Sequence, residues 1–166
     1  MSANVPDANF SAQLGSLLDQ STKLLEQLEP LLETELQALQ DRDTDALTQN
    51  NEQKVTCLSE LDRVIKARDE MLRQYQVAST SESVLTFFAS LPAPADKLLT
   101  QAWEKLEQQF DTIKKLNLRN EQVLLRSKQN TDQLLALLQG HARSNTVYNN
   151  QGDEGRYEGQ RSLGKA

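Results

Sequence analysis

The sequence predicts an all-α protein in which an antiparallel helical hairpin and a long third helix form a coiled-coil-like bundle, with one short connecting helix and a disordered C-terminal tail. Three segments place their seam residues three and four positions apart in alternation, the heptad pattern of helices packed along their length. Only 5% of the 166 residues are aromatic, and the chain has six glycines and four prolines, a composition that does not suit a β-sandwich. The heptad pattern ends at Gly140, where an aperiodic segment begins.

The first helix should begin at Phe10 and continue to Leu39 with a broad face of leucines. Because this face is wider than a two-stranded seam requires, the helix is expected to contact two neighbours. Pro30 lies inside the helix and removes one backbone hydrogen bond, at a cost of about 3 kcal/mol. The leucine pattern continues beyond the proline, which favours a kink over a break.

A polar turn at residues 41–45 leads to a second helix, expected from Leu47 to Tyr75 with Asp43 or Thr44 as its N-cap. Two long helices joined by so short a turn must lie antiparallel.

Two side chains of the second helix are distinctive. Lys54 lies on the heptad seam near the turn, where it can extend to solvent or pair with an acid. Cys57 lies beside the seam, where an inert, half-buried thiol is expected. Because it is the only cysteine, the sequence excludes a disulfide framework and fits a reducing cytoplasm.

Residues 76–95 connect the hairpin to the long helix. Ser79 and Glu82 have the spacing of a capping box and should open a short apolar helix. This helix contains two of the four phenylalanines, so we expect it to plug one end of the bundle. Pro92 and Pro94 then favour an extended turn.

The long third helix should run from Asp96 to Gln139, and its seam has two different halves. From Leu99 to Ile113 the seam residues are large and apolar, Trp103 and Phe110 among them, so this half should be buried inside the chain. Between residues 117 and 131 four of the five seam residues are polar.

A second apolar stripe, formed by Leu116, Val123 and Leu137, lies beside the polar half of the seam. A helix that stays amphipathic without a core of its own is a candidate docking strip for a helix of another protein. The alternative interpretation is that the polar seam residues only set the register and the oligomeric state.

Residues 1–140 are interpreted as a helical bundle domain and residues 141–166 as a flexible tail. The tail has four glycines and no periodicity, so it should be disordered in the free protein. Tyr148, Tyr157 and Leu163 are isolated anchors within it, of the kind that fold onto a partner.

Four acidic residues have the spacing of a calcium-binding loop. Asp41, Asp43, Asp45 and Glu52 match its first, third, fifth and twelfth positions. Ala46, however, occupies the sixth position, where the sharp turn requires glycine. A better explanation than a calcium site is that these acidic residues lie at the start of a helix, where the helix dipole stabilises negative charge.

Other chemistry is also disfavoured. His141 is the only histidine, so neither a metal cluster nor a catalytic triad can be built around it, and we expect no enzymatic activity, cofactor or metal. The net charge of −6 argues against nucleic acid as a partner. No run of about 18 apolar residues exists to span a membrane, and the first residues lack the pattern of a secretory signal.

Several short segments follow one another in an order that distinguishes this chain from other coiled coils better than any single segment does. They are Leu31-Leu-Glu-x-Glu-Leu-x-Ala-Leu, an acidic turn, Ala46-Leu, Lys54-x-x-x-Leu58-x-x-Leu61, Trp103 with Leu106, Asn117-x-x-Asn120-x-x-x-Leu124, Leu134-x-x-Leu-Leu138 and Tyr148-x-x-x-Gly152. In this order they resemble the FlgN family, the bacterial flagellar type III export chaperones. The resemblance covers about residues 10–166.

The resemblance implies a cytoplasmic chaperone that keeps hook–filament junction proteins unassembled and delivers them to the export gate. It also implies that the C-terminal half of the last long helix binds the C-terminal helical segment of the substrate, which coincides with the docking strip. Apolar strip residues would be buried by the substrate, and polar ones would set its register. The apolar residues are Leu116, Val123, Leu124, Leu134, Leu137 and Leu138, and the polar ones are Asn117, Asn120, Ser127 and Thr131.

The same resemblance implies that Tyr148, followed by Gly152, docks to the cytoplasmic domain of the export gate. A generic coiled-coil scaffold or adaptor that homodimerises through its heptad seams is the alternative function.

Overall fold

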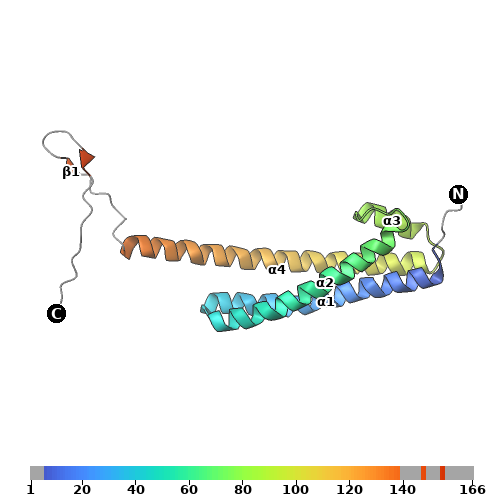
Figure 1. The fold of residues 1–166 in the computed structure, drawn as a ribbon, viewed down its shortest axis with the longest axis horizontal. Coiled ribbons are helices and arrows are strands. Elements are labelled where there is room, and N and C mark those ends of the chain that lie inside the picture. The colour runs from blue at the N-terminus through green and yellow to red at the C-terminus, as the bar shows by residue number, and fades with distance from the viewer. Residues whose placement is uncertain (1–5, 139–146, 149–153, 156–166) are drawn as a thin grey trace. The chain divides into compact units, whose positions relative to one another are not determined.

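A computed structural model describes residues 6–138, 147–148 and 154–155, and it confirms the predicted all-α architecture. Its long helices are α1 (Ala8–Asp41), α2 (Thr44–Arg73) and α4 (Ala95–Leu138), and the short connecting helix is α3 (Ser81–Ala89) (Figure 1). The chain divides into two units, Met1–Leu124 and Leu125–Ala166, and α4 contributes residues to both.

α1 and α2 form the predicted antiparallel hairpin through a very short turn. Arg42 ends α1 in the left-handed conformation, with a φ of 57°. Asp43 is the N-cap of α2, and its Oδ1 accepts a hydrogen bond of 2.9 Å from the backbone N–H of Ala46. α1 continues through Pro30, which confirms the prediction that this proline does not break the helix.

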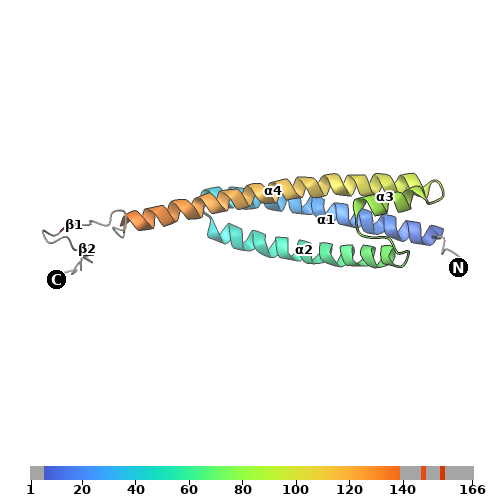
Figure 2. The ribbon, with the colours of Figure 1, turned by 90° about the horizontal axis from the view of Figure 1, so that it is seen from above.

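In the first unit α4 runs parallel to α1 and antiparallel to α2, and α3 completes the bundle at one end. Figures 1 and 2 show α3 between α2 and α4 and across the bundle from α1. The rings of Phe87 and Tyr75 lie 5.7 Å apart, and those of Phe88 and Trp103 lie 6.3 Å apart. At this end the cross-section therefore contains four helices, and the phenylalanine-rich helix closes the core as predicted.

The N-cap of α3 differs from the predicted one. Thr80, and not Ser79, has the extended backbone of a cap and accepts a hydrogen bond from the backbone N–H of Ser83. The capping box predicted from Ser79 and Glu82 was therefore wrong by one residue. Both positions offer a hydroxyl, so composition alone did not distinguish them.

Trp103 is a core residue, as predicted. It is 6% exposed, and its Nε1 donates a 3.2 Å hydrogen bond to Oγ of Ser81 on α3. The guanidinium carbon of Arg68, on α2, lies 5.1 Å from the centre of the indole ring. This side chain of α4 thus contacts both α2 and α3, which helps to set how the three helices pack.

The apolar half of the α4 seam is buried only in part. Leu99, Trp103 and Leu106 are buried as predicted, and Ile113 is half-buried. The prediction for Phe110 was wrong, because this side chain is 53% exposed. Heptad spacing predicted that Phe110 faces a partner helix, but α3 is too short to reach it.

Two short strands in the C-terminal segment were not predicted. β1 (Val147–Tyr148) pairs antiparallel with β2 (Glu154–Gly155), and Tyr148 lies opposite Glu154. The rest of the predicted tail lies outside the described residues, including Gly140, His141, Gly152, Tyr157 and Leu163.

Candidate partner-binding site

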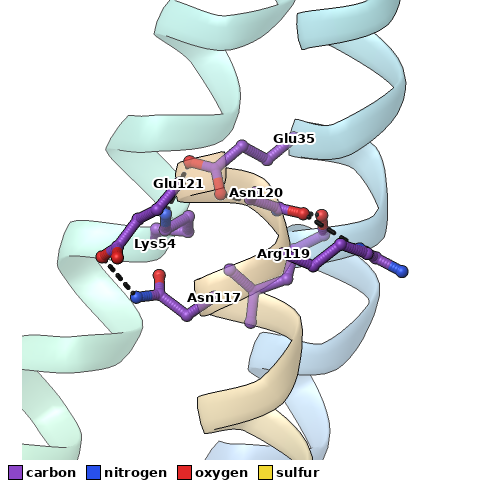
Figure 3. A network of polar contacts seen from close by, with 7 residues as sticks. Glu35, Lys54, Asn117, Arg119, Asn120 and Glu121 are labelled. Atoms are coloured by element: carbon purple, nitrogen blue, oxygen red, sulfur yellow. Dashed lines mark hydrogen bonds and ion pairs between the residues drawn. The ribbon is translucent and has the colours of Figure 1, made fainter. Parts of the chain in front are cut away.

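A layer of polar side chains ties α1, α2 and α4 together at the end of the hairpin away from α3 (Figure 3). The Nζ of Lys54 on α2 contacts Oε1 of Glu35 on α1 at 2.7 Å, and both side chains are largely buried. The other carboxylate oxygen of Glu35 accepts a 2.9 Å hydrogen bond from Nδ2 of Asn120 on α4. Lys54 therefore pairs with an acid, one of its two predicted arrangements.

Asn120 is 3% exposed, and its side chain forms hydrogen bonds with α1 and with the neighbouring Arg119. Its Nδ2 also donates to the backbone oxygen of Leu32 at 2.7 Å, and its Oδ1 accepts from Nε of Arg119 at 3.2 Å. Nη1 of Arg119 in turn contacts Glu33 at 3.1 Å. In this arrangement Asn120 holds α4 against α1, so its amide is not offered to a partner.

Asn117 lies on a different side of α4. It is exposed, and its Nδ2 donates a 3.0 Å hydrogen bond to Oε1 of Glu121 on the same helix. Figure 3 shows Asn117 and Glu121 on the side of α4 that is turned toward α2. The two asparagines of the predicted strip therefore have different surroundings.

The α4 seam separates into two rows at heptad spacing. One row, Leu106, Ile113, Asn120 and Ser127, is buried or half-buried throughout. The other row begins at buried Trp103 and is then exposed at Phe110, Asn117, Leu124 and Thr131. Within the first unit, α4 thus turns the first row toward the bundle core and, beyond Trp103, presents the second row to solvent.

The apolar members of the predicted strip are distributed around this exposed row. Leu116 and Val123 are half-buried, whereas Leu124 and Leu134 are both exposed, each at 56%. The side chains of Leu137 and Leu138 lie outside the described residues.

Sequence reasoning missed three exposed leucines in the C-terminal half of α4, which are Leu118, Leu125 and Leu135. Two of them are second members of leucine pairs, at residues 124–125 and 134–135. Adjacent residues on a helix point about 100° apart, so a leucine pair widens an apolar face beyond one seam row. These adjacent leucines could therefore have shown from the sequence that the apolar face is wider than one seam row.

Cys57 is buried and not half-buried as predicted. Its Sγ donates to the backbone oxygen of Leu24 at 3.3 Å. Burial raises the pKa of this thiol, and the nearby carboxylate of Glu60 raises it further. A raised pKa lowers the fraction of reactive thiolate at neutral pH, which fits a packing role.

The acidic run at the α1–α2 turn serves the helix ends. Oδ2 of Asp41 accepts a 2.8 Å hydrogen bond from Gln37, and Asp43 caps α2. The backbone is helical again from Thr44 onward, so residues 44–52 do not form the extended loop that such a calcium site requires. In the part of the chain that the structure describes, no group of three or more His, Cys, Asp or Glu is placed to hold a metal ion.

None of the described helices combines the length and the apolar character needed to span a membrane.

In a comparison with protein-family models, the model described as FlgN protein matches residues 10–156. The match begins at the first buried residue of α1 and includes all of α2, α3 and α4 as well as β1 and β2. Comparisons with curated proteins and with solved structures gave no match.

Proposed function

Because the chain belongs to the FlgN family, whose members are flagellar export chaperones, we propose that it binds the C-terminal helical segment of hook–filament junction proteins. It prevents their premature assembly in the cytoplasm and delivers them to the export gate. In this role it acts only by binding and uses no cofactor. The observation that supports this proposal is the exposed apolar surface of α4, which includes Leu124, Leu125, Leu134 and Leu135.

The mechanism is the docking of one amphipathic helix onto another. About half of each exposed leucine is in contact with water, so burying that part contributes about 1 kcal/mol per residue. Several such residues are needed, because association must first offset the loss of translational and rotational freedom. The bound segment is masked while it stays on α4, so it cannot pair with other copies of the substrate.

The polar strip residues have separate roles in this proposal. Asn117 and Thr131 are exposed and contact the substrate, where they set its register. Asn120 acts indirectly, since its hydrogen bonds to Leu32 and Glu35 fix α4 in the bundle. Leu116, Val123 and Ser127, which are half-buried, line the edge of the strip. Leu137 and Leu138 continue it toward the end of α4.

A double substitution in the strip tests the proposal. Leu134→Ser with Leu135→Ser should weaken binding of a synthetic junction-protein C-terminal peptide by roughly tenfold or more, measured by isothermal titration calorimetry. Leu98→Ser is the matched control, because Leu98 is also an exposed leucine of α4, at 60%. The control should bind as the unchanged protein does. Equal affinity for all three proteins would contradict the proposal, as would a protein that does not bind the peptide.

Delivery to the gate is assigned to Tyr148, on β1. Tyrosine offers a large amphipathic contact at low entropic cost, so it suits a small interface, and Gly152 follows it. Tyr148→Ala should weaken binding to the cytoplasmic domain of the export gate by roughly tenfold or more while leaving the peptide affinity and the melting temperature unchanged. Tyr157→Ala is the matched control. A Tyr148→Ala protein that loses the peptide and keeps the gate would reverse the two assignments.

A further inference from the structure

A pocket lies between the start of α1 and the start of α4, which are at the same end of the bundle (Figures 1 and 2). Its volume is about 570 Å³, within the size range of binding pockets. The described residues that line it come from α1, from α4 and from the segments just before them, and none belongs to α2 or α3. Small side chains on both helices leave this space, and they are Ala8, Ala12 and Gly15 on α1 and Ala95 and Ala102 on α4.

Leu98 projects into solvent beside this pocket. It lines the pocket and is 60% exposed, the largest exposed fraction among the large hydrophobic side chains that the structure describes. Leu98 cannot fill the pocket of its own chain, because it is part of the wall. A two-fold symmetric contact pairs the same surface of two copies, so it can bring each Leu98 to the pocket of the other copy.

Gly15 leaves room in the pocket at a cost to the helix, because glycine inside a helix is less stable than alanine. A Cβ atom at Gly15 would lie 3.6 Å from Cδ2 of Leu99, which is an ordinary van der Waals distance. Packing within the chain therefore does not require glycine at this position. The space beside Gly15 is available to a side chain from another molecule.

The surface around the pocket is almost uncharged. Residues 8–18 of α1 and residues 98–103 of α4 contain no charged residue, although 25% of the chain is charged. Asp7 is the only charged residue among those that line the pocket, and its Oδ1 accepts a 2.7 Å hydrogen bond from the backbone N–H of Phe10. The net charge of −6 makes two copies repel each other where acidic surfaces meet. At this surface two copies can approach without like charges opposite each other, whereas a charged partner finds no opposite charge.

We propose that this pocket is the contact surface of a homodimer, in which Leu98 of each copy enters the pocket of the other. The inference goes beyond the proposed function and does not depend on it. Leu98 and Leu116, the first residue of the strip, are about 27 Å apart along α4, so the dimer contact and the peptide-binding strip share no residue.

Sedimentation of the full chain at increasing concentrations, up to about 1 mM, tests this inference. The unchanged protein should dimerise as its concentration rises. Leu98→Ser should raise the dissociation constant of the dimer by roughly tenfold or more, because symmetry makes one substitution remove two leucine contacts. Ala12→Leu should also weaken the dimer, since the larger side chain occupies the pocket, although it makes the surface more apolar. Both side chains are exposed, so the melting temperature of the dilute monomer should not change.

The strip variant Leu134→Ser with Leu135→Ser is the control. It should lose the junction-protein peptide and still dimerise, whereas Leu98→Ser should dimerise weakly and still bind the peptide. A protein that stays monomeric at about 1 mM would contradict the inference. So would a dimer that is lost only in the strip variant, or one that Ala12→Leu strengthens.

Two further results would assign the pocket to a different occupant and also overturn the inference. If the protein is monomeric and Leu98→Ser lowers its melting temperature, residues 1–5 of the same chain fill the pocket. If the protein is monomeric and Leu98→Ser loses the peptide, the exported partner fills it.

Discussion

Replacing Trp103 with alanine is expected to lower the free energy of unfolding by about 3–5 kcal/mol, as is typical of a large aromatic side chain in a core. The side chain is buried and joins three elements, because it contacts Ser81, Phe88 and Arg68. Its loss leaves a cavity where α2, α3 and α4 meet. Urea unfolding followed by circular dichroism measures the change.

Trp103→Phe is the control for this prediction. Phenylalanine keeps most of the buried apolar area but cannot donate the hydrogen bond to Ser81, so we expect a smaller loss than for alanine. An alanine variant that loses less than about 1 kcal/mol would show that the tryptophan is not part of the packed core.

Replacing Glu35 with alanine should also destabilise the protein strongly, by about 3–5 kcal/mol. The substitution removes the partner of a largely buried ammonium group, that of Lys54, and one of the two acceptors of the Asn120 amide. A buried charge without a partner lowers the stability of the fold by more than the ion pair had raised it, so we expect a large effect.

Glu33→Ala is the matched control, two residues away on α1. Glu33 pairs with Arg119 in an exposed position, so its removal should cost no more than about 1 kcal/mol. Equal losses for the two variants would mean that the polar layer is solvated and does not hold the three helices together.

The heptad pattern predicted the helices well because local spacing determines them. Trp103 was correctly placed in the core, and the N-cap of α2 is Asp43, one of the two caps that the sequence predicted. Pro30 was correctly accepted inside α1, because the leucines on both sides of it continue one face.

What could not be predicted depends on residues far apart in the sequence. Phe110 has the spacing of a buried residue, but its burial requires a fourth helix at that level, and α3 ends its coverage near Trp103. Asn120 was assigned to a partner-facing strip, yet its bonds to Leu32 and Glu35 connect residues 88 and 85 positions apart. The pattern of α4 alone contains no information on either partner.

Hydrogen–deuterium exchange of the full chain, with and without the junction-protein C-terminal peptide, tests the central claim most directly. Bound peptide should slow amide exchange at residues 110–138 of α4, because burial in an interface reduces local opening. Exchange in the first turns of α1 should not change. Bound peptide that slows exchange only in α1 and α3, and leaves residues 110–138 unaffected, would contradict the account.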